Sequence, residues 1–340
     1  MKIALDVMGG DHAPRNPMGG VKLALEELTQ IEKIYLVGVP EVIEREMQQQ
    51  AIPQSPKLEI VPAYQVVDMN DSGLDAVRKK KDSSISRAVD LVKDRMADAV
   101  VSAGHTGAAV TASLIKLRTL PHIERPAIAA IMPSRSHHWV LIDAGANPDS
   151  LPGHLVQNAL MGSAYARHVL GRENPRVGLM SNGTEEEKGN ALCKETSKLL
   201  RTTPGINFIG NIEGHDLWET PPDVVVCDGF TGNIILKTSE ALAHAMFGMI
   251  KSEIMSTTRS KIGGMLAKPA FKRVHKRTSA DESGGMPLLG LNGITIIAHG
   301  GASAYAMKNA LRMACETISH QVNPHIEAAI SQHLLLHGHL

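Results

Sequence analysis

Short runs of apolar residues recur along the chain and predict the strands of a β-sheet. Most of these runs are separated by longer stretches with apolar residues at helical spacing, for example residues 84–96 and 155–170. Because the strand-like runs are apolar at nearly every position, helices must cover both faces of the sheet. This alternation predicts an α/β fold with a doubly wound, mainly parallel sheet. The predicted strands are residues 3–7, 34–37, 58–61, 99–101, 127–132, 139–142, 177–180, 224–227 and 294–298.

Residues 238–277 depart from this alternation because they contain no strand-like run. Apolar residues repeat there at helical spacing until a Gly-Gly pair at 263–264 interrupts the pattern. We expect a helical hairpin that projects from the globule, although core helices of a second lobe would give the same periodicity. The residues with this spacing are Ala243, Phe247, Ile250 and Ile254. The whole chain, residues 1–340, is expected to form one domain of two lobes around a cleft, with no linker to mark the lobe boundary.

Composition narrows the class of protein. Lys and Arg together number 35, as do Asp and Glu, so net charge gives no reason to expect a nucleic acid partner. Cys193, Cys227 and Cys315 lie far apart without a C-x-x-C pair, which is typical of reduced thiols in a cytoplasm. The chain starts on a strand-like run without a signal region, and no apolar run approaches the roughly 18 residues that span a bilayer. We therefore expect a cytoplasmic protein without a transmembrane segment.

Two segments of the chain match each other, and each contains a glycine turn. Residues 98–107 read D-A-V-V-S-A-G-H-T-G, and residues 223–232 read D-V-V-V-C-D-G-F-T-G. Each predicts a buried strand, a G-x-T-G turn and a helix, and the free amides and positive dipole end of a helix start attract anions. Because loops at the carboxyl ends of strands converge on the ligand crevice, we expect these turns to meet there. Three further glycine loops in this position are residues 8–11, 182–184 and 299–301. Tight turns are the alternative reason for such glycines.

The motifs that the chain lacks limit the kind of phosphate ligand. None of the 30 glycines belongs to a G-x-G tripeptide, and no G-x-x-x-x-G-K-[ST] loop is present. Bound NAD and ATP are therefore disfavoured, no cofactor is expected, and a small phosphate is favoured.

Several short motifs occur in order along nearly the whole chain. They are A-L-D-V-M-G-G-D from Ala4, K-K-D-S-S from Lys80, V-S-A-G-H-T-G-A from Val101, D-A-G-A-N from Asp143, E-E-E-K-G-N from Glu185, D-G-F-T-G-N from Asp228, G-G-M-P-L-L-G from Gly284 and A-H-G-G-A-S from Ala298. With these motifs the chain resembles the bacterial phosphate acyltransferase family. His105 stands where that family usually has asparagine, and Met286 where it usually has alanine.

The resemblance implies an activity and partners. Family members convert acyl-acyl carrier protein and inorganic phosphate into acyl phosphate, the first step of phosphatidic acid and phospholipid synthesis. The implied fold is a three-layer α/β/α fold like that of isopropylmalate dehydrogenase and the phosphotransacetylases. Also implied are a homodimer, no redox cofactor, peripheral association with the inner face of the cell membrane, and a membrane-embedded glycerol-3-phosphate acyltransferase as partner.

Direct attack of phosphate on a thioester needs a positioned nucleophile and donors for the developing oxyanion, but no covalent intermediate. A thiolate leaves readily because a free thiol has a pKa of about 8.5, so a strong general acid is dispensable. The chain accordingly has no G-x-S-x-G elbow and no recognised cysteine nucleophile motif. We place phosphate on the amides and the Thr231 hydroxyl of residues 229–233. The turn at residues 104–107 would be a second cradle or the source of oxyanion donors.

The candidate site residues form two sets. Those expected to take part in catalysis are His299, Asn233, Asn182 and Lys188. Those expected to bind phosphate or substrate are Gly9, Gly10, Asp11, Lys81, Ser102, Gly104, His105, Thr106, Gly107, Asn147, Gly183, Asn190, Asp228, Gly229, Thr231, Gly232, Lys237 and Gly300.

Some of these candidates have a structural alternative. His299 could instead cap the following helix, and Lys188 and Lys237 could be solvated helix residues. Aspartates at the ends of predicted strands could bind a cation, but such carboxylates also fix turns, and we expect no metal site. These aspartates are Asp6, Asp11, Asp143 and Asp228.

Two basic segments suggest partners. Residues 78–81 read Arg-Lys-Lys-Lys before a predicted helix start, and they could bind phosphate or the acidic surface of acyl carrier protein. A solvated run of charge is the alternative. In the hairpin, basic residues surround an apolar membrane tip of Ile262, Met265 and Leu266, a pattern suited to an anionic membrane surface. A dimer seam is the competing interpretation of the hairpin, and its candidate residues are Phe247, Ile250 and Ile254.

Two other functions remain open on the sequence. A metal-dependent decarboxylating dehydrogenase would share the implied fold, but the chain has no Arg-rich and Asp-rich signature for its substrate. A non-catalytic membrane scaffold for acyl carrier protein would be expected to have degenerate glycine turns, whereas these turns are intact.

Overall fold

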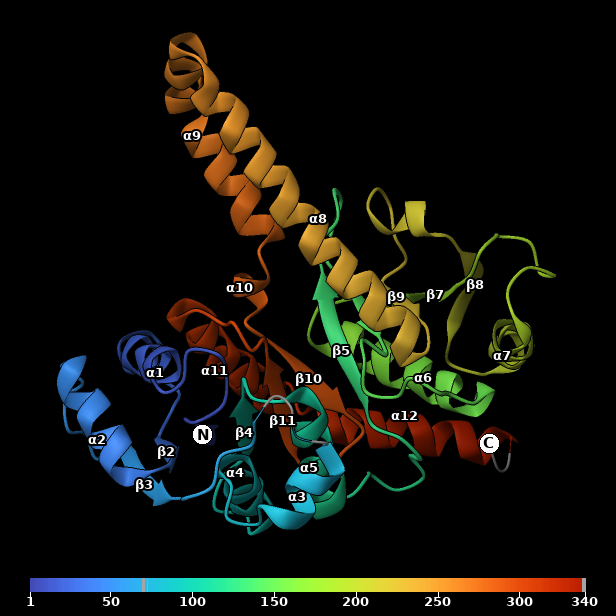
Figure 1. The fold of residues 1–340 in the computed structure, drawn as a ribbon. Coiled ribbons are helices and arrows are strands. Elements are labelled where there is room, and N and C mark those ends of the chain that lie inside the picture. Colours follow the sequence, from blue (N-terminus) through green and yellow to red (C-terminus); the bar gives the residue numbers. More distant parts are fainter. Residues whose placement is uncertain (69–70, 72, 338–340) are drawn as a thin grey trace.

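A sheet of eleven strands forms the centre of the fold, with helices on both faces (Figure 1). The computed structural model describes residues 1–68, 71 and 73–337. The strands are β1 (Lys2–Asp6), β2 (Lys33–Gly38), β3 (Leu58–Pro62), β4 (Ala99–Ser102), β5 (Ala127–Met132), β6 (Trp139–Ile142), β7 (Arg176–Met180), β8 (Asn207–Ile212), β9 (Val224–Val226), β10 (Gly285–Leu289) and β11 (Ile294–Ala298).

The helices lie between most successive strands, as the alternating pattern predicts. They are α1 (Arg15–Glu27), α2 (Pro40–Gln49), α3 (Gly73–Lys79), α4 (Ser84–Lys93), α5 (Thr106–Leu117), α6 (Pro152–His168), α7 (Ala191–Thr202), α8 (Gly229–Ser256), α9 (Thr258–Thr278), α10 (Ala280–Ser283), α11 (Ala304–Ser319) and α12 (Val322–His337), with a 3-10 helix η1 (Gly214–Leu217). No described helix is long and apolar enough to cross a membrane.

The strand order is β3-β2-β1-β4-β11-β10-β5-β6-β9-β7-β8, and the direction of the strands reverses in the middle of the sheet. Strands β1 to β4 and β11 are parallel to one another. Strand β10 is antiparallel to both neighbours, and β5 is antiparallel to β6. Strands β6 to β9 are again parallel to one another. The carboxyl ends of β1, β4 and β11 therefore lie at the opposite edge of the sheet from those of β6, β7 and β9.

This arrangement confirms the predicted doubly wound, mainly parallel α/β fold, and every predicted strand is present. Two strands escaped the sequence pattern. Strand β8 contains two asparagines and a glycine and is an outermost strand of the sheet, so it lacks a continuous apolar run. Strand β10 begins Gly-Met-Pro, and both glycine and proline are depleted in strands. The two lobes around a cleft stay a prediction.

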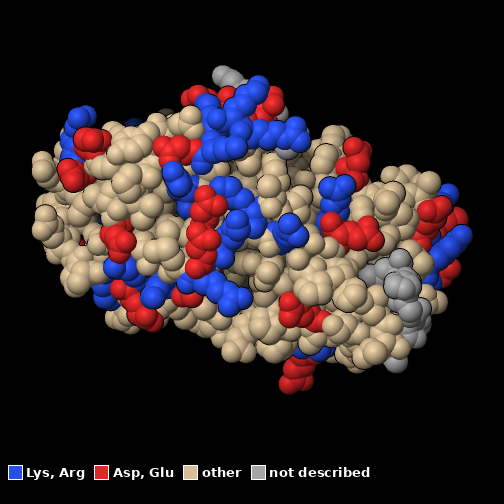
Figure 2. Space-filling model, turned by 90° about the horizontal axis from the view of Figure 1, so that it is seen from below, with Lys and Arg blue, Asp and Glu red and all other residues tan. Residues whose placement is uncertain are grey.

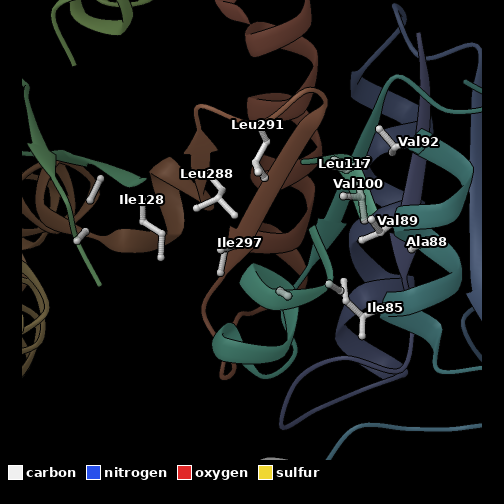
Figure 3. Close-up of a cluster of buried hydrophobic side chains, with 14 of the residues drawn as sticks. Ile85, Ala88, Val89, Val92, Val100, Leu117, Ile128, Leu288, Leu291 and Ile297 are labelled. Carbon is white, nitrogen blue, oxygen red and sulfur yellow. The ribbon is translucent and has the colours of Figure 1, made fainter. Parts of the chain in front are cut away.

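Alternate residues of each strand enter the cores on opposite faces, because successive side chains of a strand point in opposite directions. Ala4 and Val225 belong to the core that α4, α5 and α8 cover. The residues on either side of Ala4 in β1 belong to the core under α1 and α11. The residues on either side of Val225 in β9 belong to the core under α6 and α12. Figure 3 shows part of the first core, where side chains of α4 and α5 approach those of β4, β5, β10 and β11. Helices α5 and α8 thus lie on the same face of the sheet.

Helices α8 and α9 form the hairpin that projects from the globule (Figure 1). The turn lies at Thr257, which caps α9 by accepting a hydrogen bond from the Ser260 amide at 3.1 Å. The Gly-Gly pair at 263–264 therefore does not interrupt the hairpin as the pattern suggested, but lies inside α9. A side chain at Gly264 would overlap Ile254, so this glycine allows the two helices to pack closely.

Two of the three residues expected to form a dimer seam have partners inside the hairpin, while Ile250 is exposed. The ring of Phe247 meets that of His275 of α9 edge-on, with 5.3 Å between ring centroids. Ile254 faces Gly264 of α9. The opposite side of α8 exposes Leu242, Met246 and Met249. Phe247 and Ile254 thus have partners within the hairpin, and the dimer seam stays a prediction, because helical periodicity identifies an apolar face but not its partner.

A buried carboxyl group joins the carboxyl ends of β1 and β4. Asp6 is only 2% exposed, and the Ser102 hydroxyl donates to its Oδ2 at 2.7 Å. Ser102 Oγ in turn accepts the Gly104 amide at 3.1 Å. Burial raises the pKa of Asp6, and the hydrogen bond from Ser102 offsets part of that rise. This chain of bonds fixes the turn that follows β4.

We predict that Asp6→Asn changes how the stability of the protein depends on pH. Because the folded pKa of Asp6 lies above the unfolded value, the unfolded state binds fewer protons between the two values, and the free energy of unfolding falls as pH rises through that window. The variant lacks this loss, so the stability of the wild type relative to the variant should fall as pH rises from about 4.

Urea unfolding at a series of pH values measures this difference. The matched control is Asp94→Asn, which removes an exposed carboxylate at the end of α4. A gap between wild type and Asp6→Asn that stays constant with pH would contradict the prediction.

Candidate functional site

Three predicted loops meet at the carboxyl ends of β1, β4 and β11, a region we call the α5 edge because α5 begins there. Gly9 lies against Gly104, and a Cβ atom added at Gly9 would be 2.7 Å from the Gly104 amide nitrogen. The Asp11 amide donates to the Gly300 carbonyl at 2.8 Å. The glycines are thus required for close approach of the three loops. The predicted residues at this edge are Gly9, Gly10, Asp11, Ser102, Gly104, His105, Thr106, Gly107, His299 and Gly300.

A small cavity lies under this edge. Its volume is about 10 Å³, room for one water molecule. Asp6, Ser84, Ser102, Gly104 and His105 are among its lining residues. Asp6 Oδ1 is buried and has no hydrogen-bond partner among the described residues. The K-K-D-S-S motif reaches the α5 edge through Ser84, although the motif is distant from the other loops in the sequence.

The two lysines of that motif, Lys80 and Lys81, bring positive charge to this part of the molecule. The Lys80 ammonium bonds to Asp71 at 2.7 Å and to the Val66 carbonyl at 2.8 Å, so it fixes the segment before α3. Lys81 is exposed, and no ion pair is formed by it within the described part of the chain. Lys81 is therefore the lysine of the motif that is available to a ligand.

The start of α5 presents free amide groups. His105 is the N-cap residue, and its ring Nδ1 accepts the Ala108 amide at 3.1 Å. Within residues 1–68, 71 and 73–337, nothing accepts the amides of His105, Thr106 and Gly107. These three amides and the positive end of the helix dipole could hold an anion, and the cap is a side chain that is neutral when its Nδ1 accepts a hydrogen bond.

His299 lies at the same edge and is exposed. Its Nδ1 accepts the Gly301 amide at 3.1 Å. Ser303, not His299, is the N-cap of α11, since its hydroxyl oxygen accepts the Ala306 amide at 3.1 Å. His299 therefore caps the loop before the helix, and its Nε2 is the ring nitrogen left to meet a ligand.

The carboxyl ends of β6, β7 and β9 form a second region, which we call the α8 edge. Asp228 is the N-cap of α8 and accepts both the Thr231 amide at 2.9 Å and the Thr231 hydroxyl at 2.7 Å. The Gly229 amide donates to the Asn147 carbonyl at 2.8 Å. The Thr231 hydroxyl and the amides of Gly229, Thr231 and Gly232, which we expected to hold phosphate, are thus already bonded, and the cap is a carboxylate. The geometry favours the turn at residues 104–107 over this one.

The glycines of the α8 turn are explained by close packing. A Cβ atom at Gly229 would be 2.7 Å from the Asn147 carbonyl oxygen, and one at Gly232 would overlap the Asp143 carbonyl oxygen. Asp143 is fully buried and accepts hydrogen bonds from the amides of Gly145, Ala146 and Asn147. Burial raises the pKa of Asp143, and these bonds offset part of the rise. Asp143 therefore shapes the loop against which α8 begins.

The remaining predicted residues of the α8 edge lie on the loop after β7 and along α8. Asn182 Oδ1 accepts the Gly189 amide at 2.8 Å, and Asn190 caps α7 by accepting the Cys193 amide at 2.9 Å. Lys237 pairs with Glu240 one turn further along α8, so it behaves as a solvated helix residue. Within the described residues no side-chain hydrogen bond or ion pair is formed by Lys188 or Asn233, and Gly183 has no side chain to form one.

The five predicted loops therefore form two groups instead of one. No hydrogen bond or ion pair between described residues joins the α5 edge to the α8 edge. The cause is the reversal at β5 and β6, which a sequence pattern does not reveal. Both helices nevertheless cover the same core, and half-buried apolar residues border the central strands between them, namely Val110, Leu114, Ile235 and Met286.

The three thiols and the strand-end carboxylates have no reactive arrangement. Burial raises the pKa of Cys193 and Cys227, and it raises that of Cys315 to about 11, so each is a protonated, weakly nucleophilic thiol at neutral pH. Among the described residues, no group of three His, Cys, Asp or Glu side chains could hold a metal ion. The carboxylates of Asp143 and Asp228 accept backbone amides instead.

Two residues of the α5 edge were missed as site residues, Asp6 and Ser84. Asp6 was considered only as a cation ligand, yet its place as the last residue of a buried strand marks a carboxyl group that must find partners inside. Ser84 follows the helix cap Ser83, and only the docking of α4 beside β1 brings it to the cavity.

Comparisons with known proteins identify the family. The sequence model of the family described as "Fatty acid synthesis protein" matches residues 1–325. The chain is 49% identical to the phosphate acyltransferase of Akkermansia muciniphila over 337 residues, which cover 98% of this chain and 96% of that protein. It is 48% identical to the phosphate acyltransferase of Desulfitobacterium hafniense strain DCB-2 over 319 residues, 94% of each protein.

Solved structures agree on the fold. A phosphotransacetylase from Streptococcus pyogenes aligns with a TM-score of 0.62 at 19% identity and covers 94% of both chains. A branched-chain phosphotransacylase from Enterococcus faecalis aligns with a TM-score of 0.60 at 14% identity, covering 94% of this chain and 99% of the other. The predicted phosphotransacetylase-like α/β/α fold is thus confirmed. Together with the sequence matches, this fold means that the chain belongs to the phosphate acyltransferase family of fatty acid synthesis proteins, a family of transferase enzymes.

Proposed function

We propose that the protein transfers the acyl group of acyl-acyl carrier protein to inorganic phosphate and releases acyl phosphate. An oxygen of hydrogen phosphate forms a bond to the thioester carbon, the carbon–sulfur bond breaks, and the proton from phosphate ends on the carrier thiol. The acyl phosphate would then serve the first acylation of glycerol 3-phosphate in phospholipid synthesis, through a membrane-embedded acyltransferase. The observation that carries this proposal is the set of free amides at the start of α5 in a chain of this family.

Phosphate is placed at the α5 edge because of the difference between the two helix starts. At α5 three amides are free and the cap is an imidazole. At α8 the amides of Gly229, Thr231 and Gly232 are bonded, and a phosphate would meet the Asp228 carboxylate. Lys81 and the exposed ring of His299 can add donors beside α5. The apolar residues between α5 and α8, such as Val110 and Met286, suit an acyl chain.

The acidic acyl carrier protein is proposed to dock on the basic face below α3 and α4. Figure 2 shows Lys and Arg side chains gathered on this face of the molecule. Exposed basic residues on these helices and the turn between them are Arg78, Lys79, Lys81, Arg87, Lys93 and Arg95. Some of this charge is internally paired, as in Arg87 with Asp82 at 2.8 Å. Arg78 and Lys81 form no ion pair with a described residue and are the first candidates for the contact.

The activity itself has a direct test. Purified protein incubated with acyl-acyl carrier protein and phosphate should release free carrier thiol and acyl phosphate, which hydroxylamine traps as a hydroxamate. The KM for the carrier should rise with salt, because screening weakens contacts between exposed charges. A dehydrogenase or a scaffold would give neither product, and their absence would overturn the proposal.

The placement of phosphate is tested by adding a carboxylate at either helix start. Thr106→Asp should raise the KM for phosphate more than tenfold, since juxtaposed like charges cost several kcal/mol. An acidic residue in the first turn is favourable for the helix, so the variant should fold. The matched control is Phe230→Asp, which adds the same charge at an exposed position in the first turn of α8. If only Phe230→Asp weakened phosphate binding, the placement would have to move to the α8 edge.

The hairpin is proposed to serve a homodimer along its stem and the membrane at its end. The outer side of α8 exposes Leu242, Met246 and Met249, an apolar stripe that the same stripe of a second copy could cover. About two helical turns into α9, Met265 is 68% and Leu266 81% exposed, with lysines and arginines on the same helix. Apolar residues flanked by bases suit the surface of an anionic bilayer, which would place the protein in the cytoplasm at its inner face.

Leu266→Glu should lower binding to anionic vesicles about tenfold or more, because it removes the burial of a leucine and adds charge repulsion. Vesicle flotation measures this loss. Leu335→Glu on α12 is the matched control, since its side chain is equally exposed at 87% but lies on the globule. Sedimentation of Leu266→Glu should remain that of the wild type, and unchanged flotation would refute a role for the tip.

A further inference from the structure

The hydrogen bond that caps α5 fixes the chemical form of His105. Its Nδ1 lies 3.1 Å from the Ala108 amide nitrogen and accepts that hydrogen. A ring nitrogen that accepts a hydrogen bond carries no proton, so the neutral imidazole must carry its hydrogen on Nε2. The cap therefore leaves His105 with one available group, an N–H donor beside the free amides of Thr106 and Gly107.

A second observation points to a ligand at this place. Asp6 Oδ1 is buried and has no partner within the described part of the chain, and Asp6 and His105 line the same small cavity. A water molecule in this cavity would donate one hydrogen to Asp6 and have a second to donate to a ligand. Amides, an imidazole N–H and a water hydrogen are all donors, so the ligand that matches them is an anion with several acceptor oxygens, such as phosphate.

We propose that His105 binds the attacking phosphate as a neutral Nε2–H imidazole, and that a second proton on this ring switches phosphate binding off. Protonation places a hydrogen on Nδ1, which then faces the hydrogen of the Ala108 amide, so the side-chain cap is lost and that amide keeps only its bond to the His105 carbonyl at 3.0 Å. The positive end of the α5 dipole also opposes a cationic cap. The ring must then rotate away, and its Nε2–H leaves the phosphate. This inference rests on the proposed function, because it assigns a residue and a pH response to its phosphate site.

The charged groups around the ring act in opposite directions. Asp6 of β1 lies across the cavity, and Asp71, in the segment before α3, interacts with the His105 charge. The Lys80 ammonium, 2.7 Å from Asp71, offsets that carboxylate. Helix α4 contributes Ser84 and the apolar Ile85 to the cavity, and neither is charged.

Three substitutions separate the cap from the donor. Serine at this position caps a helix but has no donor that reaches beyond the cap, so His105→Ser should keep the thermal stability and raise the dissociation constant for phosphate roughly tenfold or more. Asparagine caps with its oxygen and keeps an N–H donor, so His105→Asn should restore phosphate binding relative to His105→Ser. His105→Ala should lose both the cap and the donor.

Isothermal titration with inorganic phosphate, from about pH 5 to about pH 8 where imidazoles change charge, measures these effects without turnover. All variants are expected to share some loss of phosphate affinity toward the acid end of this range. The wild type should lose at least tenfold more than this shared loss, and His105→Asn should not. Nitrogen NMR of histidine-labelled protein should find the His105 hydrogen on Nε2, assigned by its absence in His105→Asn. A hydrogen on Nδ1, or wild-type affinity in His105→Ser, would overturn the inference.

The outcome remains separable from the proposed function. If phosphate binds with the expected dependence on residue 105 but no acyl phosphate forms, the inference stands and the reaction is wrong. If acyl phosphate forms and the affinity ignores residue 105, the reaction stands and the role of His105 is wrong.

Discussion

The reversal of strand direction at β10, β5 and β6 is the constraint on which the placement of the functional groups depends. Because β5 and β6 are antiparallel, the parallel strands on either side present their carboxyl ends at opposite edges of one sheet. Loops that look equivalent in the sequence are thereby separated. At the same time, α5 and α8 start at different edges yet pack on the same core, and half-buried apolar residues of both helices and of β10 lie beside that core.

The two G-x-T-G turns have the same local structure but different neighbouring residues, and they therefore have different roles. Both turns follow a buried strand and begin a helix. At α8 the cap is a carboxylate, and a neighbouring loop takes the first amide, so the glycines serve close packing. At α5 the cap is a histidine and the first amides are free. A helix start attracts anions only where its amides are unpaired and no carboxylate already occupies the place.

The buried chain of bonds from Asp6 through Ser102 to Gly104 explains how the α5 edge can be both open and ordered. Ser102 uses its hydroxyl hydrogen on Asp6 and its oxygen on the Gly104 amide, so the turn is held from below, and the amides above remain free. The hairpin is the opposite case. Its two helices pack on each other through Phe247 and Ile254, and its outer apolar residues have no cover within the described chain. The α5 edge is thus ordered because its side chains have partners inside the fold. The hairpin exposes apolar side chains because they have no such partners within the described chain.

The sequence by itself determined the elements and the family. Continuous apolar runs identified nine strands, because a strand buried on both faces has few polar positions, and the ordered motifs pointed to the phosphate acyltransferases. Local patterns also located the glycine turns and the helical hairpin. Strand direction, the partner of each apolar face and the use of each amide were decided only by the tertiary structure. Pairing between distant segments sets these features, and periodicity within one segment carries no information about that pairing.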